Sequence, residues 1–545
     1  MNKFMNRTTI GSVMRGMCYG FTALLFAASC ANDNVTQDEK QNKDNIPAGA
    51  TVFTGTSQPE TTTTRTAILN HTKGAGASVN WSSTDKIWVK DDGGNWQQST
   101  TTIIPSAANP SYAKFALSGT YTGASHDILY TNMAVTGTQP QVEIKAEQTQ
   151  SAPNNFDHAG ESGDCGIATG NKSGSDYAFT LDHKASYLCF IPRTSNEYVK
   201  RSKLIKVEIM SDDEIAGTYN MAADGTLTLA SGGSKTITVT TGSGFDIDNS
   251  ADDMSKNATY AVVAPGTHTF RIRYWLRNTT DNPDGPIEGT VSKIVTLNCA
   301  AGSIQDITAN LNPHDYDGDY YYQWDAQEQY WKGYEWTKKL AAGVGQPTVS
   351  YGLPNATTSN NYPKNNTDPN NRWYHEGGGF GRFDATQSCA GLPNANEMSW
   401  YCMYGDPRWD FDELWTTMGH LYKGGMWFKK KSVLQADGNY DTEISADRTT
   451  DLRTTWNSYS NTSSSINNGV LPSAVDAGNY FYLPALGYYR DGLLYLVGGE
   501  CDYWSSSAYP WSRYYAYALG FNIGGVYVTG SAYCYRGYRV DGKFE

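Results

Sequence analysis

The sequence predicts a mainly β protein in which two β-sandwich domains are followed by an α+β domain. Three observations support this fold class. Residues 48 to about 312 contain many short runs in which apolar and polar side chains alternate, and clusters of Gly, Asn, Asp and Ser separate these runs. The region from residue 320 onward is instead rich in aromatic residues and contains capping patterns typical of helix N-termini. The chain has 545 residues, which is enough for three domains of ordinary size.

The first 29 residues have the pattern of an export signal. Three basic residues precede a short apolar stretch, Met17 to Ala28, which is too short to cross a bilayer as a helix. The stretch runs into Ala27-Ala28-Ser29-Cys30, and small residues directly before a cysteine resemble a bacterial lipobox. The resemblance implies that residues 1–29 are a lipoprotein signal peptide and that Cys30 receives the lipid that attaches the chain to the outer membrane. The alternative is an ordinary signal peptide in which Cys30 has no role.

Residues 30–47 are polar and are predicted to form a flexible tether. Acidic residues lie close behind Cys30, a pattern that resembles the surface-export signals of Bacteroides-type lipoproteins. The resemblance implies a location on the cell surface. No other segment of the sequence is long and apolar enough to cross a membrane as a helix.

The net charge excludes one class of partner, and the cysteines leave two possibilities for their pairing. The formal net charge is −13 and is spread along the chain, whereas a nucleic-acid partner would require a basic patch, so we expect no nucleic acid as a partner. Once Cys18 and Cys30 are set aside, seven cysteines remain, and none has CxxC spacing. An exported chain can form disulfides, so Cys389–Cys402 and Cys501–Cys534 are candidate bridges, with buried free thiols as the equal alternative.

Residues 48–178 and 179–313 form two blocks of predicted strands, and a stretch rich in Gly, Ser and Asn (151–176) leads from the first block to the second. The period-two alternation within the blocks is typical of antiparallel β-sandwiches. The clearest alternating runs are Ser78–Trp81, Lys86–Val89, Lys203–Ile209, Lys235–Val239 and Thr269–Trp275.

Several short motifs in these blocks resemble the fimbrillin family of Bacteroides-type pilins. In the first block they are Thr64-Arg65-Thr66, Val79-Asn80-Trp81, Asp85-Lys86-Ile87-Trp88-Val89 and Phe115-Ala116-Leu117-Ser118-Gly119. In the second block they are Leu181-Asp182-His183-Lys184-Ala185, Ile215-Ala216-Gly217-Thr218-Tyr219 and Tyr260-Ala261-Val262-Val263-Ala264-Pro265-Gly266. The resemblance covers roughly residues 50–312 and implies two transthyretin-like β-sandwich domains.

The same resemblance gives Arg65 a candidate role as a site of proteolytic processing. In the resembled pilins a protease cuts after an arginine near the first strand, and a strand of a neighbouring subunit fills the groove that is opened. The implied partners are therefore other pilin subunits, bound by strand addition. The alternative is that Arg65 is an ordinary strand or linker residue. A different C-terminal domain departs from a stalk pilin and favours a tip subunit, which receives a strand and donates none.

Two helices are predicted in the third region. Asn394 with Glu397, and Asp410 with Glu413, have the spacing of helix-capping pairs. The buried faces would consist of Met398, Tyr401 and Cys402 in the first helix and of Leu414, Trp415, Met418, Leu421 and Tyr422 in the second. After Tyr480 short strands are predicted again, at residues 481–483, 493–497, 516–522 and 526–528.

Two helices followed by an aromatic, β-rich end are typical of the C-type-lectin-like fold. Four motifs point the same way: Leu392-Pro393-Asn394-Ala395-Asn396-Glu397-Met398, Leu483-Pro484-Ala485, Tyr503-Trp504-Ser505-Ser506-Ser507 and Arg536-Gly537-Tyr538-Arg539-Val540. They resemble the Fibrobacter succinogenes major paralogous domain and the lectin-like variable proteins of diversity-generating retroelements. The resemblance implies that residues 320–545 form a C-type-lectin-like, ligand-binding domain.

The last sixty residues have the composition of a binding surface. Residues 486–545 contain twelve Tyr among Ser, Gly and Ala, and rigid amphipathic rings beside small adaptable residues are typical of binding loops. The predicted ligand-binding residues are Tyr509, Trp511, Arg513, Tyr514, Tyr527, Thr529, Ser531 and Tyr533. The alternative is that many of the tyrosines pack in the core, where Trp504 and Phe521 are predicted to lie.

No catalytic residue, metal site or cofactor is predicted. The HExxH, GxSxG and P-loop motifs are absent from the sequence. His375-Glu376 is predicted to be structural, and the acidic residues of 315–319 lack the spacing of an EF-hand. Formylglycine-generating enzymes also use a lectin-like scaffold, and there Cys501 and Cys534 would be the reactive pair.

These observations predict a cell-surface lipoprotein adhesin that is not an enzyme. It would be a fimbrial tip or minor pilin subunit that binds a protein or glycan ligand through its C-terminal domain, and it would reside at the outer membrane, on the cell surface and in fimbriae. The second hypothesis is a structural pilin or anchor subunit without a ligand of its own. A formylglycine-generating type of enzyme is the third.

Overall fold

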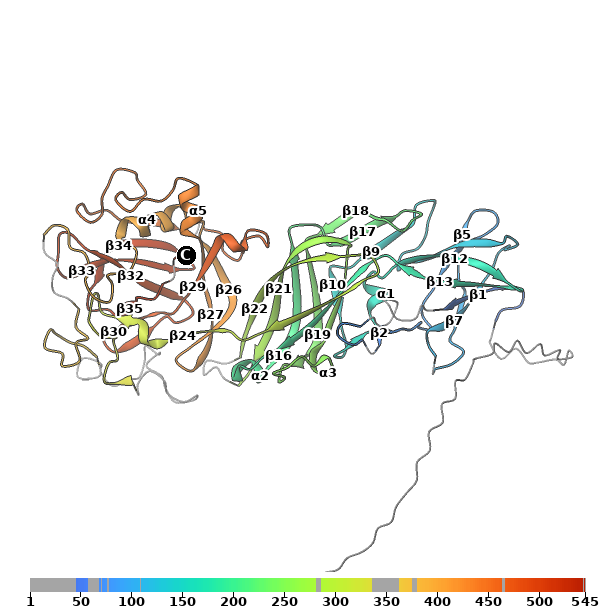
Figure 1. The fold of residues 1–545 in the computed structure, drawn as a ribbon, viewed down its shortest axis with the longest axis horizontal. Helices are drawn as coiled ribbons and strands as arrows, with labels where there is room; N and C mark the ends of the chain where they lie inside the picture. Colours follow the sequence, from blue (N-terminus) through green and yellow to red (C-terminus); the bar gives the residue numbers. More distant parts are fainter. Residues whose placement is uncertain are drawn as a thin grey trace, which may run out of the picture. The chain divides into compact units, whose positions relative to one another are not determined.

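The computed structural model describes residues 46–56, 68–69, 71–75, 78–107, 109–280, 286–335, 362–374, 380–462, 466–542 and 544. Within them the protein is mainly β, with several sheets and a few short helices, as the sequence predicted (Figure 1). No helix in this part of the chain is long and apolar enough to cross a membrane. The signal peptide with Cys30, the candidate cleavage position Arg65 and His375-Glu376 lie outside the described residues.

A nine-stranded sheet surrounds the first core. Its strands are β1 (Thr51–Thr56), β4 (Trp88–Lys90), β5 (Trp96–Gln98), β6 (Thr101–Ile103), β7 (Tyr112–Leu117), β8 (Ser125–Tyr130), β12 (Gly166–Ser173), β13 (Asp176–Thr180) and β14 (Asp182–His183). β1 is antiparallel to β7 and parallel to β13, so Phe53 is in register with both Phe115 and Tyr177. All three rings are fully buried, and Phe53 stacks on Tyr177 with 4.7 Å between ring centroids. Aromatic packing of this kind stabilises the first core.

The second core is formed by one long sheet and several shorter ones. The long sheet contains β10 (Glu147–Thr149), β16 (Ser202–Ser211), β19 (Thr236–Asp246), β21 (Gly266–Asn278) and β22 (Ile287–Cys299). The three-stranded sheets are formed by β15 (Ser186–Arg193), β20 (Thr259–Val263) and β23 (Ile304–Asn310); by β9 (Gln141–Ile144), β17 (Ala216–Met221) and β18 (Leu227–Ser234); and by β2 (Ile68–Leu69), β3 (Ser78–Val79) and β11 (Asn155–Phe156). Val207 of β16 pairs with Val239 and Tyr274, and all three side chains are buried. From Val207 to Ser211, beyond a bulge between Leu204 and Lys206, the predicted alternation thus places every second side chain of β16 in the core.

Three one-turn helices accompany the second core. They are α1 (Ala159–Ser162), α2 (Glu197–Lys200) and α3 (Met254–Asn257). The chain crosses between the first two cores more than once: Val142 and Phe156 pack in the second core, although they precede Tyr177 and Phe179, which pack in the first. The first two cores are therefore joined by several segments of chain.

The third region contains a six-stranded sheet with a core on each face. The sheet consists of β25 (Tyr321–Tyr322), β28 (Tyr459–Thr462), β32 (Glu500–Ala508), β33 (Tyr515–Asn522), β34 (Gly525–Tyr533) and β35 (Tyr538–Arg539). The other elements are β24 (His314–Tyr316), β26 (Arg408–Thr417), β27 (His420–Lys429), β29 (Tyr480–Pro484), β30 (Tyr488–Arg490), β31 (Leu493–Tyr495), α4 (Ala395–Tyr404), α5 (Lys431–Ala436), η1 (Gly318–Tyr320) and η4 (Ala477–Asn479). The larger core, which we call the main core, includes Tyr503, Phe521 and Val528. The smaller one, called the minor core, includes Trp504. Burial of Trp504 and Phe521 confirms that prediction.

Helix α4 begins where the sequence predicted. The Asn394 side chain accepts a hydrogen bond from the Glu397 backbone N–H (3.1 Å), and the Asn394 N–H donates to Glu397 Oε2 (2.8 Å). This reciprocal pair is the predicted capping box, and it satisfies two backbone N–H groups at the helix start. Met398, Tyr401 and Cys402 are all buried, as expected.

The predicted second helix is wrong, because that segment forms the β-hairpin of β26 and β27. Met418 and Gly419 occupy the turn with φ of 49° and 81°, and two consecutive positive φ values are typical of a type I′ turn. Trp415 and Tyr422 face each other across the hairpin, with ring centroids 5.3 Å apart. β29 pairs along the other edge of β27, so backbone groups that a helix would satisfy internally are satisfied between strands.

The hairpin also extends the long sheet of the second sandwich. β26 pairs in parallel with β22 at Thr290 and Glu413. Across the same junction Arg273 of β21 lies 3.1 Å from Asp412 and 3.8 Å from Asp410. The second sandwich and the third region therefore share a sheet and an ion-pair network.

Glu413 makes this junction sensitive to pH. Its carboxylate accepts hydrogen bonds from the Ser292 N–H (3.2 Å) and Oγ (2.6 Å), but burial and the neighbouring Asp410 carboxylate raise the pKa of Glu413 to about 7. A group whose pKa is higher in the folded state than in the unfolded state stabilises the fold when protonated. Its contribution is therefore full below pH 4.5, the ordinary pKa, and is lost as the pH rises through 7.

We expect Glu413→Gln to be better tolerated at pH 8 than at pH 5.5, because glutamine stays neutral at both values. The measurement is the difference in melting temperature between the variant and the wild type at the two pH values. Glu288→Gln on β22 is the control, since Glu288 is 43% exposed. A difference that is the same at both pH values would contradict the raised pKa of Glu413.

All seven cysteines in the described residues are buried free thiols, so the candidate disulfides are wrong. Cys402 and Cys501 pack in the main core, whereas Cys389 and Cys534 pack in the minor core. The two cysteines of each proposed disulfide therefore belong to different cores, one on each face of the six-stranded sheet. The free-thiol alternative is the correct one.

Candidate ligand-binding surface

The side chains of β34 alternate between the two faces of the six-stranded sheet. Val526 and Val528 point into the main core and are fully buried. Tyr527 and Thr529 lie between them in sequence and point to the other face, where they are half-buried.

A β-bulge reverses this arrangement near the end of the strand pair. The register of β33 and β34 shifts between Ala516 and Ala518. Beyond the shift Ala516 pairs with Ala532, and both lie in the minor core. Their neighbours Tyr515 and Tyr533 pair with each other and so point to the face of the main core, at its edge.

Six rings meet at this edge, and we call them the aromatic cluster. They are Trp456, Tyr509, Trp511, Tyr515, Tyr533 and Tyr535, each linked to another member by a ring contact. Tyr533 lies 4.8 Å from Tyr515 and 5.0 Å from Tyr535 between centroids, and Trp511 lies 6.3 Å from Tyr509. Offset and edge-on arrangements at these distances stabilise one another, so the cluster is a preformed surface rather than six independent side chains.

The cluster is open to solvent. Trp511 is 51% exposed, Trp456 45% and Tyr533 37%. The adjacent Tyr514 is 52% exposed, and the Arg513 guanidinium lies 5.2 Å from its ring. Within the cluster itself, Arg536 lies 5.6 Å from the ring of Tyr533. The surface therefore combines large apolar rings with a cationic group.

Gly530 leaves room for one ring of the cluster, Tyr509. A Cβ atom at this position would lie 2.6 Å from Tyr509 Cδ2 and 3.0 Å from Tyr517 Cε1. Tyr517 is fully buried in the main core, so only the half-buried Tyr509 could move away. The absence of a side chain at Gly530 is what lets the Tyr509 ring lie against the strand.

We therefore expect Gly530→Ala to displace Tyr509 and to lower the free energy of unfolding by about 1–3 kcal/mol through overcrowding. Near-ultraviolet circular dichroism of the rings, together with urea unfolding, measures both effects. Gly478→Ala is the matched control, because a Cβ there would meet nothing within 4 Å. Equal stability of the two variants would show that the close approach at Gly530 is unimportant.

The eight predicted residues are divided between two surfaces. Tyr509, Trp511 and Tyr533 belong to the aromatic cluster, whereas Arg513 and Tyr514 contact each other and are near Trp511 and Tyr515 in the sequence. The others, Tyr527, Thr529 and Ser531, lie elsewhere: the Thr529 and Ser531 hydroxyl oxygens are 2.8 Å apart, and Tyr527 and Thr529 point to the face of the minor core. In the described part of the chain, no ring contact joins Tyr527 to the cluster.

Sequence reasoning missed three members of the cluster. Tyr515 and Tyr535 lie within the tyrosine-rich segment and could have been selected by the same composition. Trp456 lies far upstream, and no local pattern marks it as a neighbour of Trp511, from which it is 6.4 Å away. Only the three-dimensional structure brings that residue to the surface.

Tyr527 belongs to a more polar surface that includes Asp502. Gly520 pairs with both Asp502 and Tyr527, so these side chains flank the glycine on one face of the sheet. Burial and the neighbouring Glu500 raise the pKa of Asp502 to about 8. This surface is distinct from the aromatic cluster because it lies on the opposite face.

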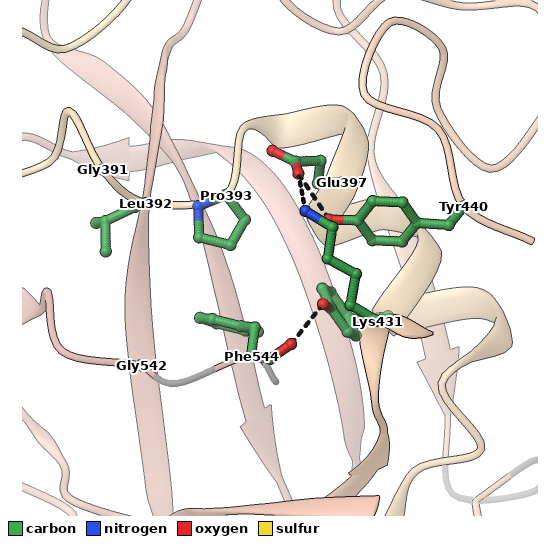
Figure 2. A pocket seen from close by; sticks show the side chains of 9 residues that line it. Gly391, Leu392, Pro393, Glu397, Lys431, Tyr440, Gly542 and Phe544 are labelled. Carbon is green, nitrogen blue, oxygen red and sulfur yellow. Dashed lines mark hydrogen bonds and ion pairs between the residues drawn. The ribbon is translucent and has the colours of Figure 1, made fainter. Parts of the chain in front are cut away.

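A pocket of about 640 Å³ lies beside α4 (Figure 2). Glu397 accepts a hydrogen bond from the Tyr440 hydroxyl (2.6 Å) and lies 3.5 Å from Lys431 Nζ, while the Tyr401 hydroxyl donates to the Phe544 backbone oxygen (2.8 Å). The residues that line the pocket are Gly391, Leu392, Pro393, Glu397, Tyr401, Lys431, Tyr440, Gly542 and Phe544. Because these polar groups pair with one another, we interpret the pocket as a structural junction, and none of the predicted ligand-binding residues lines it.

The thiols that the enzyme hypothesis requires are not brought together. Cys501 lies in the main core with its Sγ toward the Gly487 carbonyl (3.7 Å), whereas Cys534 lies in the minor core. Burial raises the pKa of both thiols well above the ordinary value. Neither group is placed to act as a nucleophile on a solvent-borne substrate.

The comparisons with known proteins are distant. No family model matches the chain, and no curated protein matches it. Among solved structures, a candidate cell adhesion protein from Bacteroides ovatus is 12% identical, with a TM-score of 0.29, over 48% of this chain and 91% of that one. A candidate cell adhesion protein from Bacteroides fragilis is 11% identical (TM-score 0.28; 48% and 92% covered), and the fimbrial anchor protein Mfa2 from Porphyromonas gingivalis is 10% identical (TM-score 0.23; 48% and 90% covered). At such low scores, neither the function nor the assembly of those proteins is transferred to this chain.

Proposed function

We propose that this chain is a lipid-anchored, cell-surface adhesin of the fimbrial type, whose C-terminal domain binds a protein or glycan through the aromatic cluster. The observation that supports the proposal most strongly is the exposure of Trp456, Trp511 and Tyr533 within one connected cluster of rings. Large rings are costly to leave in water, and contiguous exposed apolar surface is a mark of interaction sites.

The chemistry of the cluster suits two ligand classes. The faces of Tyr and Trp rings pack against apolar faces of a partner, and residues of this type carry most of the binding energy in protein interfaces. Arg536, which lies against Tyr533, adds charge that would favour polar or anionic groups on the ligand. Tyr515 and Tyr533 are held by the paired strands β33 and β34, so little ordering cost is paid for these two rings on binding.

The fimbrial part of the proposal is supported by the sequence. The motifs of residues 50–312 resemble fimbrillins, and the lipobox at Cys30 resembles those of exported lipoproteins. On this view the two sandwiches connect the anchored end to the binding domain, at the outer membrane and in fimbriae. A tip or minor pilin subunit would be cut after Arg65 and would receive a neighbour's strand.

Glycan and protein arrays probed with the purified full chain test the binding proposal. We expect selective binding to a small set of spots, and we expect free ligand from those spots to compete with it. Binding to no spot, on arrays that include host-surface glycans and extracellular proteins, would favour the structural hypothesis instead.

One observation supports the second hypothesis, in which the chain is a structural subunit without a ligand of its own. β26 and β27 extend the sheet of the second sandwich, so the third region covers what would otherwise be the edge of β22. A region that caps a sheet edge in this way could serve to end a fibre. If so, removing the ring surface would leave fibre length unchanged, whereas weakening the β22–β26 junction would alter it.

A further inference from the structure

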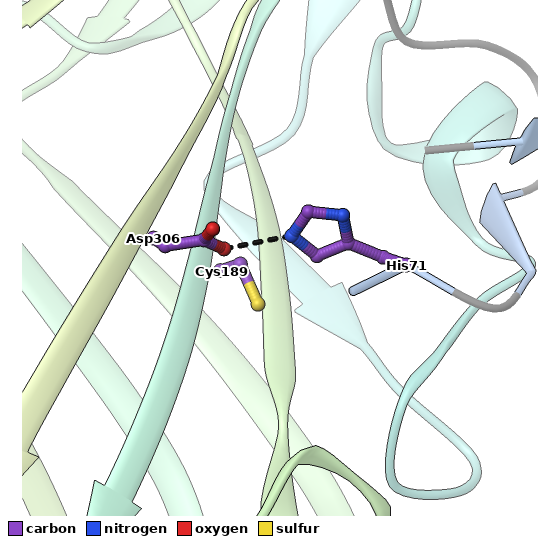
Figure 3. Close-up of side chains that lie close together, drawn as sticks. All are labelled: His71, Cys189 and Asp306. Atoms are coloured by element: carbon purple, nitrogen blue, oxygen red, sulfur yellow. Dashed lines mark hydrogen bonds and ion pairs between the residues drawn. The ribbon is translucent and has the colours of Figure 1, made fainter. Parts of the chain in front are cut away.

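Three metal-ligating side chains meet in the second sandwich, outside the surface described above. His71 follows β2, Cys189 lies on β15 and Asp306 lies on β23 (Figure 3). Their donor atoms all lie within 4.8 Å of one another, and His71 Nε2 is 2.7 Å from Asp306 Oδ1. We propose that His71, Cys189 and Asp306 bind a zinc ion.

The set of donor atoms suits Zn²⁺ better than other common cations. Imidazole nitrogen, thiolate sulfur and carboxylate oxygen are the usual zinc ligands, whereas Ca²⁺ and Mg²⁺ prefer oxygen alone. Three protein ligands leave a fourth tetrahedral position for a water molecule. The distances between the donor atoms are short enough for a single ion to reach all three after small side-chain movements.

The neighbouring residues orient and bury the three proposed ligands. The Gly74 N–H donates a hydrogen bond of 2.7 Å to Asp306 Oδ2 and so orients the carboxylate, as outer partners of metal ligands do. The His71 and Cys189 side chains are fully buried, and Asp306 is 15% exposed. A divalent cation at this point would supply the positive charge that stabilises the Cys189 thiolate.

A second histidine–aspartate pair in the same protein provides a comparison. His183 Nδ1 lies 2.8 Å from Asp164 Oδ1, and both side chains are buried. Among the described residues, the set of His71, Cys189 and Asp306 is the one group of three possible ligands close enough to share an ion, so the His183 pair lacks a third. The extra thiol is what distinguishes the proposed site from an ordinary buried pair.

Zinc at this position would attach residues 71–75 to the second sandwich. That segment already contacts the sandwich through the ion pair of Lys73 with Asp252 (2.5 Å) and through the Gly74 hydrogen bond. A metal that binds only the folded arrangement stabilises it in proportion to its affinity. The site would therefore hold the segment that follows Arg65 independently of any cleavage there.

Zinc titration of the purified full chain, stripped of metal with a chelator, tests the proposal. We expect one tightly bound zinc per chain by elemental analysis and a higher melting temperature with zinc than with chelator. Cys189→Ser and His71→Gln should each weaken zinc binding by more than about 100-fold, since loss of a direct ligand exceeds the effect of an outer partner. His183→Gln is the control and should bind zinc as the wild type does.

Cobalt(II) gives a readout that does not depend on how well the variants fold. In the wild type it should produce the thiolate-to-metal charge-transfer band of a cysteine ligand. Absence of that band in the wild type, or zinc binding that His183→Gln weakens as much as Cys189→Ser does, would overturn the proposal.

Discussion

Replacing Arg539 with alanine is expected to lower the free energy of unfolding of the C-terminal region by about 3–5 kcal/mol. The Arg539 side chain is fully buried, forms a two-pronged ion pair with Asp541, and donates a hydrogen bond of 2.7 Å to the Asp317 carbonyl. Its guanidinium also lies 4.6 Å from the ring of Tyr321. Truncation would remove all of these contacts, leave a cavity, and leave Asp541 without its cation.

Hydrogen exchange of the backbone amides in β32 to β35 measures this effect locally. Exchange through unfolding should become faster by about 100-fold or more, since 1.4 kcal/mol corresponds to a factor of ten. Arg382→Ala is the control: Arg382 also pairs with an aspartate, Asp384, but both side chains are more than 40% exposed, so we expect a change of about 0.5 kcal/mol or less. Similar exchange in the two variants would show that burial of Arg539 is not what stabilises the region.

The second large effect concerns binding. Replacing Trp511 and Tyr533 together with alanine should weaken binding of the array-identified ligand by about 1,000-fold, because each ring is the type of residue that contributes 2 kcal/mol or more at an interface. The same change should leave stability nearly unaltered, since Trp511 is 51% and Tyr533 37% exposed. Titration calorimetry gives the affinity, and thermal unfolding gives the stability.

Val475→Ala is the control for that experiment. Val475 is 62% exposed, and its N–H donates to Asp212 of the second sandwich, on a different part of the chain. We expect its affinity to equal that of the wild type. A double variant that still binds within about threefold of the wild type would exclude the aromatic cluster as the main contact.

Local signals in the sequence predicted local structure well. The capping box of Asn394 and Glu397 depends on residues three apart, and it fixed the start of α4. Leu414, Met418 and Leu421 also have helical spacing, yet they lie in a hairpin. Their spacing suits both structures, and the choice is made by β22 and β29, whose positions no local pattern reveals.

For the candidate site too, the sequence indicated some of the residues, and only the tertiary structure identified the others. Composition alone indicated a tyrosine-rich surface, and three of the eight predicted residues lie in the aromatic cluster. A single bulge between Ala516 and Ala518 then sends Tyr533 and Tyr527 to opposite faces, which strict alternation could not anticipate. His71 and Asp306, 235 positions apart, were invisible as a pair for the similar reason that only the tertiary fold joins them.

Hydroxyl-radical footprinting of the full chain, with and without its array-identified ligand, tests the central claim most directly. If the aromatic cluster is the binding surface, ligand should protect Trp456, Trp511 and Tyr533 from oxidation. Phe411, which is 41% exposed and remote from the cluster, should react equally in both samples. Saturating ligand that leaves both tryptophans as reactive as before, or that protects Phe411 instead, would contradict the claim.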